Sequence, residues 1–335
     1  MSSHTKLFSL LIIVLTLSVS CRSDDNGSDL VSSTYRQEMR SFVQNLSAYA
    51  KAINPDFLII PQNGQELVTD TRESDGIPNV DYLNAIDATG REDLFYGYDE
   101  DDKATSSADR QHLLDLCLLY EQNGVQVLTT DYCFTLSKMQ NSYQLNLQNG
   151  FISYAADHRD LDNIPSYPSS PFNENADDIV NISQAKNFLY ILDFSQFSTK
   201  QTFIAAVNST NYDAIIMDLF FEGAEFSAYE IESLKTKQNG GKRLILAYMS
   251  IGEAEDYRYY WQSKWRVGNP SWLKAENPDW EGNYKVQYWN SEWQSIIYGN
   301  DDSYLKKIIN NGFNGAYLDI IDAFEYFELL NHIYN

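Results

Sequence analysis

Carboxylates, an arginine and aromatic side chains cluster in the segment RLILAYMSIGEAEDYRYYW at residues 243–261. Its apolar first half predicts a buried strand, which Gly252 interrupts. Glu253, Glu255 and Arg258 follow directly after this glycine. Charged groups at the end of a buried strand are typical of the way in which a barrel enzyme presents its acid, base and ligand-binding groups.

A second segment, NGFNGAYLDIIDAFEYF at residues 311–327, repeats this arrangement near the C-terminus. A short predicted strand at 315–318 is followed by Asp319 and then by Asp322, before a helical pattern begins. Two strand ends that are rich in acids suggest one shared site.

Other predicted strands also end at a carboxylate. Aspartate is common at strand-to-helix turns and helix N-caps, where its oxygens accept backbone hydrogen bonds, so any single one could be structural. The regularity of the whole set favours a shared acidic pocket at the carboxyl ends of the strands. The set consists of Asp131, Asp157, Asp193, Asp218, Glu253 and Asp319.

A ring of carboxylates suits glycoside cleavage, binding of a hard metal ion, or recognition of a cationic ligand. The many tyrosines and tryptophans of residues 248–293 favour carbohydrate, because flat rings stack on the apolar faces of sugars. Some of these rings must belong to the core, but Trp280 and Trp289 lie in polar, loop-like surroundings. The four histidines are scattered and no phosphate-binding loop is present, so we expect no metal and no cofactor. A metal-dependent carbohydrate enzyme remains an alternative.

The elements that must position these groups alternate between short apolar strands and helical patterns. This alternation predicts an α/β fold, a (β/α)8 TIM barrel, with residues 35–335 as a single domain. The main competitor is an open doubly wound sheet, but PQNGQ after the first strand is no glycine-rich phosphate loop. The eight predicted strands are 57–60, 125–129, 151–155, 188–192, 214–217, 243–249, 284–288 and 315–318.

The N-terminus resembles a bacterial lipoprotein signal. Residues 1–20 have the apolar core of a signal peptide, and LSVSC at its end resembles a lipobox in which Cys21 becomes lipidated. Residues 21–34 predict a lipidated cysteine followed by a flexible tether. We therefore expect a lipid-anchored protein of the bacterial cell envelope, at the outer membrane or the cell surface. A plain cleaved secretory signal is the alternative.

The chain has a formal net charge of −23, which makes nucleic acid an unsuitable partner. Two cysteines remain after Cys21, and both Cys117 and Cys133 lie in apolar surroundings. Buried thiols and a disulfide bond between them are both compatible with this pattern.

Three motifs carry a family resemblance: AYMSIGEAEDYR, NPDWEGNYKVQYWN and GFNGAYLDIIDAFEYF. They resemble the TIM-barrel domain of glycoside hydrolase family 114, in particular a branch formerly labelled as related to cysteinyl-tRNA synthetase. Members of the family are described as endo-α-1,4-polygalactosaminidases. The resemblance therefore implies an endo-acting glycosidase whose substrate is a polysaccharide or oligosaccharide, and a galactosaminan-like polymer of amino sugars is the substrate that the family's description suggests.

The chain departs from the motifs of the characterised hydrolases at two positions. Those hydrolases tend to show Glu-x-Trp-Arg-x-Asp, and here Glu255 and Arg258 match while Tyr260 stands at the last aspartate. They also tend to show Gly-Val-Glu-Pro-Asp-Asn-x-Asp, and here Tyr317 stands at the glutamate while Asp319 and Asp322 match the two aspartates.

Two hypotheses follow for the function. The first is a lipid-anchored hydrolase of an extracellular polysaccharide, in which Glu253 and Asp319 are the catalytic carboxyl pair and Asp218 is the alternate. The second is a non-catalytic carbohydrate-binding lipoprotein on the same scaffold. Roles in substrate binding are predicted for Tyr248, Glu255, Arg258, Trp289 and Asp322, and for the strand-end aspartates Asp131, Asp157 and Asp193.

Overall fold

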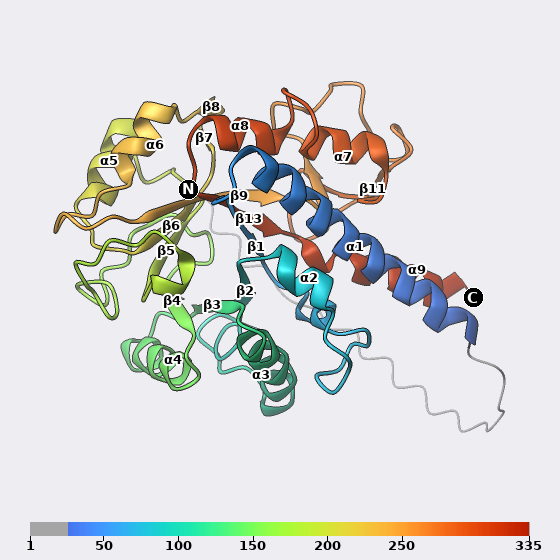
Figure 1. The fold of residues 1–335 in the computed structure, drawn as a ribbon, viewed down its shortest axis with the longest axis horizontal. Helices are drawn as coiled ribbons and strands as arrows, with labels where there is room; N and C mark the ends of the chain where they lie inside the picture. The colour runs from blue at the N-terminus through green and yellow to red at the C-terminus, as the bar shows by residue number, and fades with distance from the viewer. Residues whose placement is uncertain (1–25, 335) are drawn as a thin grey trace, which may run out of the picture.

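The computed structural model describes residues 26–334 and shows a mixed α/β fold with a parallel central sheet (Figure 1). The predicted α/β class is therefore confirmed. The predicted signal peptide and Cys21 lie outside the described residues. Within residues 26–334, no helix combines the length and the apolar character needed to cross a lipid bilayer.

Within residues 26–334, eight parallel strands form two sheets. The larger sheet has the order β1 (Leu58–Pro61), β13 (Gly315–Asp319), β9 (Leu244–Ser250), β6 (Ala214–Met217) and β5 (Phe188–Ile191). The smaller sheet has the order β2 (Ala88–Glu92), β3 (Gln126–Tyr132) and β4 (Ile152–Ala156). Single parallel bridges, Gln62 to Gly90 and Ser153 to Asn187, connect the edges of the two sheets. Since all the neighbours are parallel, the carboxyl ends of the eight strands lie on the same side.

The prediction of a parallel strand at 284–288 is wrong. In the structure β12 (Asn283–Val286) pairs antiparallel with β10 (Glu253–Glu255) and β11 (Leu273–Glu276), in a separate small sheet. Its partner β10 comes directly after β9, so this sheet is an excursion from the carboxyl end of that strand. Alternation of polar and apolar residues indicates a strand but does not say which sheet the strand joins.

The strand β2 was absent from the sequence prediction. Its residues, ATGRE, include no large apolar side chain, so the strand has no run or alternation of apolar residues from which it could be predicted. Gly90 is required in this strand because a Cβ there would lie 2.0 Å from the Tyr317 hydroxyl oxygen. The ring of Tyr317 therefore fills space that a side chain on β2 would otherwise occupy.

Helices follow most of the strands. Figure 1 shows the long helix α1 (Asn26–Ile53) beside α9 (Phe324–Tyr334), and the ion pair between Arg36 and Glu328 at 2.9 Å joins them. α1 begins at Asn26, inside the segment expected to be a tether. The other helices are α2 (Val80–Ala85), α3 (Ser107–Gln122), α4 (Leu136–Gln148), α5 (Lys200–Asn208), α6 (Ala228–Leu234), α7 (Ser291–Ile297) and α8 (Tyr304–Asn310). Shorter elements are the 3-10 turns η1 (Gln65–Val68), η2 (Ile182–Gln184) and η3 (Ile321–Ala323), and the hairpin of β7 (Phe220–Phe221) and β8 (Ala224–Glu225).

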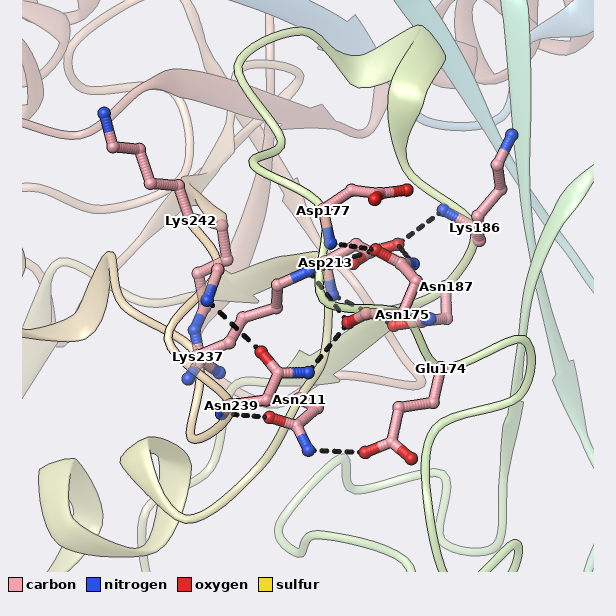
Figure 2. Close-up of polar contacts among 12 residues, drawn as sticks. Glu174, Asn175, Asp177, Lys186, Asn187, Asn211, Asp213, Lys237, Asn239 and Lys242 are labelled. Carbon is pink, nitrogen blue, oxygen red and sulfur yellow. Dashed lines mark hydrogen bonds and ion pairs between the residues drawn. The ribbon is translucent and has the colours of Figure 1, made fainter.

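A long loop takes the place of a helix between β4 and β5, and a buried ion pair fastens it at the amino ends of the strands (Figure 2). Lys237 Nζ lies 2.9 Å from Asp213 Oδ1, and both side chains are fully buried. The same ammonium group donates to Asn175 of the loop, whose own amide donates to Asp213 Oδ2 at 2.8 Å. Because Asp213 directly precedes β6, this network lies at the end of the strands opposite their carboxyl ends.

Both cysteines of the described chain are buried free thiols. Burial raises the pKa of the Cys117 thiol to about 12, so that it remains protonated at neutral pH. Of the two alternatives left open by the sequence, the structure shows buried thiols and no disulfide between them.

Candidate functional site

A cavity of about 960 Å³ opens at the carboxyl ends of the parallel strands. The residues that line it come from at least six of these strands or from the turns directly after them, as expected for an α/β enzyme site. Seven of the residues predicted for the site line the cavity: Asp193, Asp218, Tyr248, Glu255, Arg258, Asp319 and Asp322.

Two acidic side chains of the cavity lining, Glu92 and Asp319, share a hydrogen-bond partner. Gln62 Nε2 lies 2.7 Å from Glu92 Oε2 and 3.1 Å from Asp319 Oδ1, so that one amide group contacts both. Tyr248 donates its hydroxyl proton to Asp319 Oδ2 at 2.7 Å. Tyr132 donates to Glu92 Oε1 at 2.5 Å. We call Glu92 and Asp319 the carboxyl pair.

The environment of the carboxyl pair favours a proton on Asp319. Burial, together with the negative charge of Glu92, raises the pKa of Asp319 to about 8. Burial also raises the pKa of Asp322 to about 6. The hydrogen bond that Asp319 accepts from Tyr248 opposes this rise of its pKa but does not cancel it. Glu92 accepts hydrogen bonds from Gln62, Asn63 and Tyr132. A protonated acid beside a hydrogen-bonded carboxylate is the arrangement that general acid catalysis requires.

The backbone after Asp319 is strained. Ile320 has a φ of 58°, in the left-handed region that a β-branched residue rarely adopts. This turn places both Asp319 and Asp322 in the lining of the cavity. Gly252 permits it, because a Cβ at 252 would lie 2.1 Å from the carbonyl oxygen of Ile320. Strained residues of this kind are concentrated at functional sites.

An ion-pair cluster forms another part of the lining. Arg258 Nη1 lies 2.7 Å from Asp218 Oδ2, and Arg258 Nε lies 2.6 Å from Glu255 Oε2. Tyr257 donates its hydroxyl proton to Glu255 Oε1 at 2.6 Å. Burial raises the pKa of Asp218 while the guanidinium group of Arg258 opposes this shift. The arginine is therefore shared between two buried acids and holds both in place at the cavity surface.

Both tyrosines that replace motif acids are packed away from the cavity. Tyr260 accepts the backbone N–H of Glu255 at 3.0 Å, and its ring meets Trp293 edge to face. Tyr317 is completely buried within β13 and its ring contacts Tyr190. Neither residue lines the cavity. The tyrosines at these two motif positions therefore have a structural role in this protein.

Four predicted site residues lie outside the cavity lining. Glu253 is completely buried and forms an ion pair with Lys285 at 2.5 Å. Asp131 is buried and accepts the backbone N–H groups of Phe95 and Tyr96, which is the capping role expected of a structural aspartate. Asp157 accepts a hydrogen bond from Asn163, and Trp289 packs against Tyr35 and Phe327.

Several residues of the site were missed by the sequence prediction. Glu92 could not be found because β2 itself was not predicted. Gln62 and Asn63 are polar residues at the end of the first predicted strand, but amide side chains are not acids, so the pattern of strand-end carboxylates did not include them. Arg159, which lines the cavity and stacks 3.8 Å from the ring centroid of Tyr132, lies in a loop without pattern.

Across residues 26–334, no group of three or more histidine, cysteine, aspartate or glutamate side chains is arranged to hold a metal ion. The cavity can supply acid catalysis through the carboxyl pair and can bind hydroxyl or amine groups through its remaining acids.

Three uncharacterized proteins are similar to parts of this chain. The protein from Methanocaldococcus jannaschii is 42% identical over 177 residues, which are 52% of this chain and 49% of the relative. The proteins from Thermotoga maritima and Deinococcus radiodurans are 42% identical over 120 residues and 39% identical over 126 residues. These two alignments cover 36% and 37% of this chain and 36% and 38% of the relatives, so the matches span about half or less of each relative's length.

A family model also matches the C-terminal half of the chain, over residues 169–332. This segment contains the ion-pair cluster, Tyr248, Asp319 and Asp322, whereas Glu92 and Gln62 precede it. The matching family is glycoside-hydrolase family GH114, and the resemblance predicted from the sequence motifs is thereby confirmed for residues 169–332.

Proposed function

We propose that this protein is a glycoside hydrolase that cleaves an extracellular polysaccharide in the cavity of a (β/α)8 barrel. The bridges between the two parallel sheets support closure of the eight strands into a barrel. The family match supports a glycoside-hydrolase-like function. The observation that carries the proposal is the carboxyl pair, Glu92 and Asp319, which lies in a cavity that aromatic side chains also line.

In this proposal Asp319 is the general acid and Glu92 is the nucleophile. Asp319 gives its proton to the glycosidic oxygen while a carboxylate oxygen of Glu92 bonds to the anomeric carbon and the glycosidic C–O bond breaks. Water then attacks the same carbon, returns a proton to Asp319 and releases Glu92. Glu253 is not used, because it is completely buried and outside the cavity lining.

The shared contact with Gln62 Nε2 keeps the carboxyl groups close together. Retaining glycosidases have carboxyl separations of roughly 5–5.5 Å, whereas inverting ones need roughly 6.5–9.5 Å to admit a water molecule. The pair therefore predicts retention of the anomeric configuration.

The charge of the cavity favours a cationic sugar. Its lining contains eight acidic side chains and two arginines, so it remains negative when Asp319 is protonated. Protonated amines of a partly deacetylated amino-sugar polymer would be attracted to this excess of negative charge. A galactosaminan-like substrate fits both this charge and the resemblance to the family.

The test is a screen of the purified chain against galactosamine, glucosamine and neutral polymers, with detection of new reducing ends. Asp319→Asn and Glu92→Gln should each lower the rate at least ~100-fold. Glu232→Gln, which changes an exposed glutamate on α6, is the matched control and should leave the rate unchanged. Equal cleavage by Asp319→Asn and the parent protein would refute the assignment of Asp319.

Tyr260 and Tyr317 favour a second candidate, a non-catalytic carbohydrate-binding protein, because two motif acids are absent. Saturable binding of a polymer from the same panel, with no new reducing ends, would favour this candidate. Cleavage that disappears in Asp319→Asn would exclude it.

A further inference from the structure

An exposed tryptophan stands on the turn between β11 and β12. Trp280 is 53% exposed, yet it belongs to the cavity lining. Tyr257, which follows β10, is 61% exposed and also lines the cavity. Tyr259 lines the cavity as well and is 43% exposed, but its ring packs against Tyr260 and Tyr304. Packing does not account for the exposure of the Trp280 and Tyr257 rings in the same cavity.

The turn that carries Trp280 is fixed to β10. The backbone N–H of Asp256 donates to the carbonyl oxygen of Gly282 at 2.8 Å, and Gly282 N–H donates to the Glu276 side chain at 2.9 Å. Gly282 has a φ of 86°, and a Cβ there would lie 2.7 Å from Asp256 Oδ1. This backbone contact also places the Trp280 turn next to Asp256, the residue before Tyr257.

Glu253 anchors the same turn from inside the protein. Its Oε1 atom accepts a hydrogen bond from Asn277 Nδ2 at 3.0 Å. The same oxygen forms the ion pair with Lys285. The side-chain oxygen of Asn277 in turn accepts a hydrogen bond from the backbone N–H of Asp279. The backbone carbonyl oxygen of Asn277 accepts one from the backbone N–H of Trp280. Glu253 therefore connects the buried end of the small sheet to the turn that presents the indole ring.

We propose that Trp280 and Tyr257 form a sugar-stacking subsite, in which the indole ring covers the apolar face of one pyranose ring of the polysaccharide. The two rings are more exposed than Glu92 and Asp319, which are half-buried, and in this proposal they bind a sugar unit away from the cleaved bond. Glu253 is then a positioning residue for Trp280. The inference rests on the proposed function, because it assumes that the cavity binds a sugar chain.

Binding to an inactive protein tests this subsite separately from cleavage. Calorimetric titration of Asp319→Asn with partly deacetylated galactosamine oligosaccharides of increasing length gives the reference affinity. Adding Trp280→Ala should weaken the binding of long oligosaccharides by roughly tenfold, about 1.4 kcal/mol, and change that of the shortest ones little. Trp280→Phe should retain most of the affinity. Tyr229→Ala, an 85% exposed tyrosine outside the cavity, is the control and should have no effect.

Equal affinities of the Asp319→Asn protein with and without Trp280→Ala would overturn the subsite while leaving the proposed function intact. If the Asp319→Asn protein and the parent bind no sugar polymer, both the subsite and the proposed function fail.

A double-mutant cycle tests the positioning role of Glu253. Glu253→Gln should weaken the binding of long oligosaccharides when Trp280 is present and should have no further effect when Trp280 is alanine. Additive losses would overturn the connection between Glu253 and Trp280.

Discussion

At the scale of single residues, the proton on Asp319 decides what the site can do. Its pKa of about 8 means that the carboxyl group is largely protonated at neutral pH, with burial and the charge of Glu92 as the causes. A general acid must be protonated to act, so activity should fall as the pH rises through about 8. A pH–rate profile on an accepted polymer checks this, and a rate that stays constant to pH 10 would contradict it.

The same proton links the site to stability. A folded-state pKa of about 8, against a usual value of 3.8, means that the folded protein binds this proton more tightly than the unfolded chain does. The contribution of Asp319 to stability is therefore complete below pH 4 and is lost as the pH rises through 8. Asp319→Asn stays neutral, so at pH 9 it should raise the melting temperature by a few degrees relative to the parent. Each kcal/mol gained in the free energy of unfolding corresponds to about 2–4 °C. At pH 4 the difference should be much smaller, and thermal unfolding at both pH values measures it.

At the scale of elements, β2 and β13 fit together through a glycine and a tyrosine. A methyl group at Gly90 would lie 2.0 Å from the Tyr317 hydroxyl oxygen, which itself is buried without a hydrogen-bond partner in the described structure. Gly90→Ala should therefore destabilise the protein by about 1–3 kcal/mol. Tyr317→Phe removes the hydroxyl, so it should cost little by itself and should recover part of the loss in the double variant. Urea unfolding of the four proteins measures the coupling, and strictly additive effects would contradict the contact.

The network in Figure 2 fastens the loop before β5 to the amino ends of the strands. Lys237→Met leaves Asp213 buried without its cation, and such losses cost about 3–5 kcal/mol. Changing Asp213 to asparagine in the same chain should reduce the loss, because no uncompensated charge remains. Since the network lies opposite the cavity, the protein that still folds should keep its KM. Denaturant unfolding measures the loss of stability, and steady-state kinetics on an accepted polymer measure KM. A large change of KM in the folded variant would contradict the separation of this network from the cavity.

At the scale of the whole molecule, the proposed role needs a chain that reaches an extracellular polymer. We propose that Cys21 provides the lipid anchor, on the basis of the LSVSC sequence and the apolar run before it. Cys21→Ala should move the protein from the membrane fraction to the soluble fraction of cells that express the full chain. Cys133→Ala, which changes a buried thiol, is the control and should leave the protein with the membranes. Retention of Cys21→Ala in the membrane fraction would exclude lipidation at this residue.

The overall charge belongs to this scale as well. The acids of the cavity lining add to a chain that already carries a net charge of −23, so the field around the cavity is negative. Such a field attracts a polycationic sugar chain and repels nucleic acid.

The sequence by itself determined the α/β class, the resemblance to family GH114 and the position of Asp218 and Asp319 at strand ends. These features depend on local patterns, because apolar runs, helical spacing and short motifs are readable within one segment. Only the tertiary structure decided that β12 belongs to a small antiparallel sheet and that ATGRE forms a strand of the parallel one. It also brought Glu92 to Asp319, across more than two hundred residues of chain, and enclosed Glu253 in the interior. The reason is physical: whether a carboxylate faces a cavity, a backbone N–H or a lysine depends on which strands lie next to it, and strand neighbours are set by packing across the whole molecule.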